Sequence, residues 1–258
     1  MTVGKMKGWV KVLVGFSALA LFAACSSKGS SGSGGGAPAS SSAVISGKAV
    51  KGPISNGTVT AYAVTSSGGK GAVLGTTPTD VNGNYSLTLN YTGPLLLEIT
   101  GGSYIDEATG QTVNVPTSPG SGLQAVVSNV TAGSTLQVQI TPLTAMATAR
   151  AQAMTGGLTA SNISAANQQV GAYFGGIDIL NTQPINPLVA NSSTGATQNA
   201  INYGIILAGL SQEAQTLGLT NPFSLVTALV QDFSDGNFDG ASGSTPIQLN
   251  GSAMNRNH

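Results

Sequence analysis

The sequence is poor in the residues that most catalytic and metal sites use. Its 258 residues include one cysteine, Cys25, and one histidine, His258, which sits at the terminus, where order is least expected. A Ser-His-Asp triad or a histidine-based zinc site therefore cannot be assembled convincingly from this chain. A lone cysteine also excludes an internal disulfide. This inventory predicts a protein that is not an enzyme.

Charge is scarce as well, because charged residues make up only 7% of the chain, against ~25% in typical soluble domains. Nine basic residues balance nine acidic ones, but three of the basic ones lie in an N-terminal segment that we expect to be removed. The mature chain would then carry a charge of about −3. Its only arginines are Arg150 and Arg256, and it has no basic cluster. We therefore expect no nucleic-acid partner.

The N-terminus has the layout of a secretory signal. Lys5, Lys7 and Lys11 form a basic start, and a short apolar run extends from Val12 to Phe22. This run is too short for a membrane-spanning helix, which needs ~20 apolar residues. Small residues then precede the single cysteine. The segment predicts export followed by cleavage.

The sequence Phe22-Ala23-Ala24-Cys25 resembles the bacterial lipobox, with Phe22 where leucine is usual. In that motif the cysteine thiol is joined to diacylglycerol and becomes the first residue after cleavage. An ordinary signal with an incidental cysteine is the alternative. Ser26 stands where an aspartate would favour inner-membrane retention. The resemblance thus implies a protein anchored by lipid to the outer membrane, on the periplasmic face or the cell surface.

Composition divides the chain into five parts. We expect a signal peptide at 1–24, the lipidated Cys25 with a flexible Ser/Gly tether at 25–43, a β domain at 44–140, a helical domain at 141–240 and a C-terminal tail at 241–258. The predicted fold class is α+β in separate domains, an antiparallel β-sandwich followed by a small helical bundle.

Short apolar runs separated by turns fill the predicted β domain. Residues 85–89 alternate polar and apolar side chains, and the preceding Asn82-Gly83 is typical of a tight hairpin. Short strands at this density predict an antiparallel sandwich. Strands are expected at 44–50, 58–64, 73–77, 85–89, 95–99, 123–127 and 136–140.

Helical periodicity begins at Thr141, which can cap a helix whose first residue is Pro142. Further helices are expected at 161–174, 197–217 and 221–233, where glycines or an Asn-Pro pair mark ends and starts. In the third helix, Ile201, Ile205 and Ala208 form the face that we expect to be buried. Four amphipathic helices can bury a common core.

Three segments in the predicted β domain follow one another in a recognisable order: 47–53, 59–62 and 79–85. They resemble the carboxypeptidase-regulatory-like (transthyretin-like) β-sandwich over residues 44–100. The resemblance implies a non-catalytic accessory or binding module of the kind found in surface lipoproteins. It does not imply carboxypeptidase activity, and the chain has no zinc-ligand set.

One acidic segment has the spacing of a metal loop. Asp235, Asn237 and Asp239 alternate with other residues and are followed by Gly240, as at the start of an EF-hand calcium loop. Pro246 stands where the bidentate glutamate should be, and Asp232 could supply an outside carboxylate. Two interpretations stay open: a calcium site formed by these four side chains, or an acidic turn that closes the fourth helix.

Asp106 and Glu107 are adjacent acids that we expect in a solvated loop, pointing to opposite faces. The leading hypothesis for the whole chain is a lipid-anchored lipoprotein with a non-catalytic binding or structural role. One alternative is a calcium-stabilised module that binds a glycan or a surface protein through its Ser, Thr and Asn side chains. Another is a carboxylate-based hydrolase, which requires two acids facing one cleft.

Overall fold

The computed structural model describes residues 41–254. The predicted signal peptide, Cys25 and the tether up to residue 40 lie outside the described residues. The described residues belong to one compact unit. It contains antiparallel sheets and four α-helices among the described residues, which confirms mixed α and β content.

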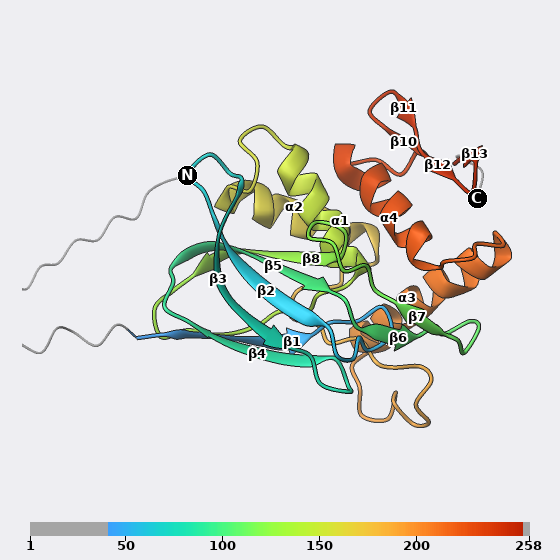
Figure 1. The fold of residues 1–258 in the computed structure, drawn as a ribbon, viewed down its shortest axis with the longest axis horizontal. Helices are drawn as coiled ribbons and strands as arrows, with labels where there is room; N and C mark the ends of the chain where they lie inside the picture. Colours follow the sequence, from blue (N-terminus) through green and yellow to red (C-terminus); the bar gives the residue numbers. More distant parts are fainter. Residues whose placement is uncertain (1–40, 255–258) are drawn as a thin grey trace, which may run out of the picture. The chain divides into compact units, whose positions relative to one another are not determined.

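Two sheets make up most of the strand structure (Figure 1). The larger has the order β3-β2-β5-β8 and is antiparallel throughout; its strands are β2 (Thr58–Val64), β3 (Lys70–Pro78), β5 (Gly93–Thr100) and β8 (Leu123–Val130). The smaller has the order β4-β1-β9, in which β1 and β9 run parallel; its strands are β1 (Ala43–Lys48), β4 (Asn84–Leu89) and β9 (Thr135–Gln137). All seven strands predicted from the sequence are present.

Short hairpins were not predicted. One lies between β5 and β8 and consists of β6 (Ser103–Ile105) and β7 (Thr112–Asn114). Two more follow the last helix, where the sequence predicted only a tail; they pair β10 (Ala241–Ser242) with β11 (Thr245–Pro246), and β12 (Gln248–Leu249) with β13 (Ser252–Ala253). Strands of two or three residues are too short for a periodic pattern to reveal them.

The four helices begin close to the predicted positions. They are α1 (Pro142–Ala153), α2 (Ala160–Tyr173), α3 (Gln198–Thr216) and α4 (Phe223–Asp232), and a 3₁₀ turn, η1 (Phe233–Asp235), continues α4. The Thr141 hydroxyl accepts from the Thr144 amide at 3.2 Å and caps α1, as predicted. Among residues 41–254, no helix combines the length and the apolar character that crossing a bilayer requires.

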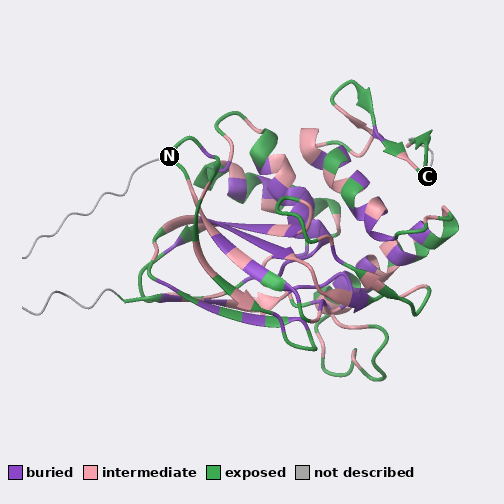
Figure 2. Cartoon of the chain, viewed as in Figure 1, coloured by how far each residue is buried: buried purple, intermediate pink, exposed green. Residues whose placement is uncertain are grey.

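The central strand β5 buries side chains on both of its faces (Figure 2). Leu95 and Leu97 enter one hydrophobic cluster together with residues of the smaller sheet, whereas Leu96 enters a second cluster with residues of α1, α2 and α3. The first cluster also takes in Phe223 and Val226 of α4. The predicted boundary between residues 140 and 141 therefore does not separate two hydrophobic cores.

The predicted buried face of α3 is wrong. Ile205 is 57% exposed, and the side of the helix that is buried carries Tyr203, Gly204, Leu207, Ser211 and Ala214. Two of these positions, a serine and a glycine, have no apolar side chain to reveal them. The contacts that bury them come from distant parts of the chain.

Gly204 permits a close approach between α3 and the segment that precedes it. A Cβ atom at this position would lie 2.5 Å from Cγ1 of Ile185 and 2.6 Å from its carbonyl oxygen. The Ile185 amide also donates to the Ala200 carbonyl at 3.1 Å. Because the obstructing atoms include backbone, a larger residue must displace the segment that contains Ile185.

We expect Gly204→Ala to lower the free energy of unfolding by about 1–3 kcal/mol, the usual cost of overpacking. Gly209 of the same helix is the matched control, because its Cβ would meet nothing within 4 Å. Gly209→Ala should stabilise the chain by up to ~1 kcal/mol through helix propensity alone. Urea unfolding of both variants measures the difference, and equal effects would contradict the close packing at Gly204.

Candidate functional site

Lys51 follows β1 and is fully buried. Its Nζ atom donates to three oxygens: Oε2 of Glu107 at 3.1 Å, the carbonyl of Leu207 at 3.2 Å and Oγ of Ser211 at 2.5 Å. Three acceptors engage all three hydrogens of an ammonium group. The ring centroid of Tyr104 lies 5.5 Å from the same nitrogen, within the range of a cation–π contact. The charge is thus buried with a complete set of partners.

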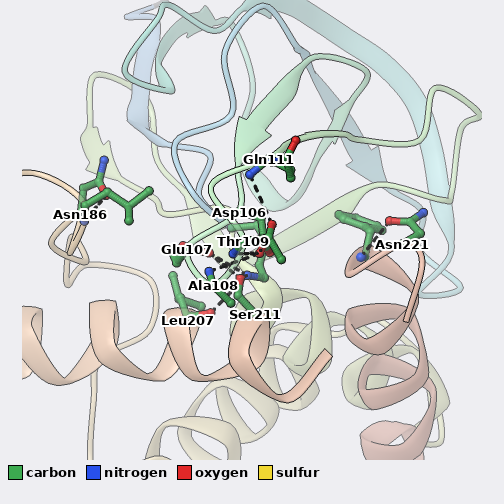
Figure 3. A network of polar contacts seen from close by, with 12 residues as sticks. Asp106, Glu107, Ala108, Thr109, Gln111, Asn186, Leu207, Ser211 and Asn221 are labelled. Atoms are coloured by element: carbon green, nitrogen blue, oxygen red, sulfur yellow. Dashed lines mark hydrogen bonds and ion pairs between the residues drawn. The ribbon is translucent and has the colours of Figure 1, made fainter. Parts of the chain in front are cut away.

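This network joins three parts of the chain that are far apart in sequence. Glu107 lies in the loop between β6 and β7, and its side chain is 5% exposed. The Ser211 hydroxyl donates to Glu107 Oε2 at 2.6 Å. Figure 3 shows the loop with Glu107 lying against α3 at Leu207 and Ser211. The turn after β1, the β6–β7 loop and α3 are therefore held at one point, which we call the Lys51 network (Lys51, Glu107, Leu207 and Ser211).

Asp106 organises the loop beside this network. Its Oδ1 atom accepts from the amides of Ala108 at 3.2 Å and Thr109 at 3.1 Å, and from the Thr109 hydroxyl at 3.0 Å. These bonds form the turn that links β6 and β7. Because Asp106 is fully buried and Glu107 nearly so, the prediction that both acids lie in a solvated loop is wrong.

The surroundings of Asp106 favour its charged form. Burial opposes ionisation, but the Thr109 hydroxyl, the Thr109 amide and the positive charge of Lys51 outweigh it. Together they hold the pKa of Asp106 below its ordinary value. The carboxylate therefore contributes to stability through its charge.

A serine beside a lysine is also the arrangement of some nucleophile–base pairs. Here the lysine hydrogens are all directed at acceptors, and the serine donates its own hydrogen to Glu107. Both side chains are fully buried. The geometry fits a structural role, in which the two side chains hold the turn after β1, the β6–β7 loop and α3 together.

An open cleft of about 800 Å³ lies beside the same turn. One side is formed by Lys48, Val50 and Pro53, together with Asn82 of the turn between β3 and β4. The other side is the segment from residue 181 to the first turn of α3. Its volume lies in the ~300–1,000 Å³ range of small-molecule sites.

The lining of this cleft is polar and nearly uncharged. It includes Asn82, Thr182, Gln183, Ser192 and Thr194, whose side chains make no hydrogen bond to the described part of the chain. Within residues 41–254, Lys48 is the one charged residue that lines it, and no carboxylate does. The walls therefore present unused neutral donors and acceptors to whatever enters.

The acidic segment after α4 is a turn held together by backbone amides. Oδ1 of Asp232 accepts from the amides of Asp239 at 3.2 Å, Gly240 at 2.9 Å and Ala241 at 3.1 Å. Asp235 accepts from the amide of Asn237 at 3.0 Å and, through Oδ2, from that of Gly243 at 2.8 Å.

These bonds make the segment after α4 a turn, which both interpretations allow. No group of three or more His, Cys, Asp or Glu residues within 41–254 is arranged to hold a metal ion. Calcium binding by Asp232, Asp235, Asn237 and Asp239 stays a prediction.

Other acids that a hydrolase could use lie in different surroundings. Glu98 is buried in the larger sheet, where it pairs with Lys70 at 2.8 Å and accepts from the Gly120 amide. Glu213 lines an apolar groove between α3, α4 and the last hairpin. Neither these acids nor Asp106 and Glu107 line the cleft of about 800 Å³.

No protein-family model matches the chain, and a search of curated proteins finds no similar sequence.

We expect Lys51→Met to lower the free energy of unfolding by about 3–5 kcal/mol, because it leaves the Glu107 carboxylate buried without its cation. The double variant Lys51→Met/Glu107→Gln should recover part of this loss. Lys48→Met is the control, since Lys48 forms no ion pair with the described residues, and should change stability by less than ~0.5 kcal/mol. Urea unfolding measures all three. If Lys51→Met loses no more free energy of unfolding than Lys48→Met, the stabilising role of the Lys51 network is contradicted.

The pH dependence of stability tests Asp106. Its pKa is lower in the folded state than the unfolded value of about 3.9. The stability that it contributes is therefore complete above that value and is lost as the pH falls through the folded pKa.

We expect the wild type to lose more stability between pH 5 and pH 2.5 than Asp106→Asn, which keeps the Oδ1 acceptor but cannot ionise. Unfolding midpoints at the two pH values provide the measurement. Identical losses in both proteins would show that this carboxylate does not contribute through its charge.

Proposed function

We propose that this protein is a lipoprotein anchored through Cys25 to the outer membrane or cell surface, where it binds a ligand or partner without transforming it. The basic start, the short apolar run and the lipobox-like residues before Cys25 support the anchor. The single cysteine has no internal partner, so lipidation is the use that its position favours.

The observation that carries the binding role is the cleft of about 800 Å³ with unused hydrogen-bonding side chains. Binding sites combine a concave shape with a few polar groups that orient the ligand. The Lys51 network supports this role indirectly. It fixes α3, whose first turn forms part of one wall of the cleft.

We also propose that the two sheets correspond to a transthyretin-like β-sandwich serving as the accessory module. Residues 47–85, which carry the resemblance, extend from β1 to β4. Ile45 and Leu87 of the smaller sheet and Val59 and Leu97 of the larger one belong to a single hydrophobic cluster, which is the packing that a sandwich requires.

Metabolic labelling with an alkynyl fatty acid, followed by membrane fractionation, tests the anchor. The wild type should be labelled and recovered with the outer membrane, whereas Cys25→Ser should be unlabelled. Ser27→Ala, two residues away, is the control and should behave as the wild type. An unlabelled wild type, or label retained in Cys25→Ser, would exclude lipidation at this residue.

The binding role is tested in the same cells with a photo-cross-linking residue in place of Gln183, at the cleft. Its control replaces Gln215, an exposed residue on α3 outside the cleft lining. Adducts should form at position 183 and not at position 215. Absence of adducts at 183, or equal adducts at both positions, would contradict a binding role for the cleft.

A further inference from the structure

The polar groups of the cleft are the kind that pair with hydroxyls. Side-chain amides offer both donors and acceptors, and so do hydroxyl groups. The side-chain amides of Asn82 and Gln183 form no hydrogen bond with the described residues; only the backbone amide of Asn82 does, to Asp80. Asn186 uses its Oδ1 atom to accept from the Leu188 amide at 3.1 Å and leaves its NH₂ group available. A ligand rich in hydroxyls can use all three.

Apolar surface lies between these polar groups. Pro53 and Ile185 are half-buried and Val189 is 54% exposed, and all three line the cleft. Such a surface suits the C–H faces of sugar rings, while their hydroxyls reach the amides at the sides. No aromatic residue of the described part of the chain lines the cleft, so we invoke no stacking of sugar on an aromatic ring.

Charge in the cleft argues against an ionic ligand. An anionic polymer is bound by clusters of Lys and Arg, and a cationic one by carboxylates. Among the described residues, Lys48 is the only charged residue of the lining. A single cation is not a cluster, and no carboxylate of the described residues lines the cleft, so the lining matches an uncharged ligand.

We propose that the cleft binds an uncharged oligosaccharide, an inference that rests on the proposed binding function and names its ligand class. The amides of Asn82, Gln183 and Asn186 orient the sugar hydroxyls. Pro53, Ile185 and Val189 contact the ring faces.

The test is calorimetric titration of the purified full chain with four uncharged hexasaccharides of glucose, xylose or N-acetylglucosamine units: maltohexaose, cellohexaose, xylohexaose and chitohexaose. Oligogalacturonate of similar length is the charged comparison. We expect saturable binding of at least one uncharged probe and weaker binding of oligogalacturonate. Asn82→Ala and Gln183→Ala should each weaken the binding about fivefold, the effect of losing one hydrogen bond worth ~1 kcal/mol.

Gln215→Ala is the matched control and should bind as the wild type. Asn82 and Gln183 are both exposed, so their variants are expected to fold, and urea unfolding checks this. Binding by none of the four uncharged probes, tighter binding of oligogalacturonate, or affinity unchanged in both folded cleft variants would overturn the proposal.

The cross-linking experiment at position 183 distinguishes the proposed binding function from the proposed ligand class. A protein adduct at this position without any glycan binding overturns the ligand class and leaves the binding function standing. If neither adducts nor glycan binding is observed, both the ligand class and the binding function are overturned. A glycan adduct at position 183, together with calorimetric binding, supports both.

Discussion

The buried ammonium of Lys51 is the interaction on which the arrangement of this fold depends. Taking a charge out of water costs several kcal/mol, and only well-placed partners offset that cost. Here the partners come from the β6–β7 loop and from α3, so the charge is satisfied only when both lie in place. The network therefore contributes more to a unique arrangement of these elements than to their overall stability.

The cleft follows from the position of α3. Tyr203, one turn before Leu207, shares a hydrogen bond of 2.6 Å with the Thr141 hydroxyl that caps α1, and donates to the Ile179 carbonyl at 3.2 Å. Gly204 lets the segment with Ile185 pack directly against the helix. A helix held by buried polar contacts thus positions a wall whose own polar groups remain free for a ligand.

Local patterns predicted the elements, whereas the sites depend on contacts that no local pattern contains. The strand at 58–64 and the cap at Thr141 were predicted because alternation and capping act within a few residues. Burial of Lys51 depends on partners 56 and 160 positions away, so it reads from the sequence as an ordinary turn lysine. Gln183 and Asn82 are likewise common loop residues until the fold places them on one cleft. The burial of Ser211 could have been inferred only from its helical spacing to Leu207 and Ala214, which lie on the same face of α3.

Amide hydrogen exchange in Lys51→Met, compared with the wild type under the same conditions, tests the central claim most directly. If Lys51 fixes α3 and through it the cleft wall, amides of α3 and of residues 181–197 should exchange faster in the variant, and by a larger factor than those of β2 and β5, whose rates rise only with the loss of global stability. Unchanged exchange in α3, or equal acceleration in α3 and the central strands, would contradict the account.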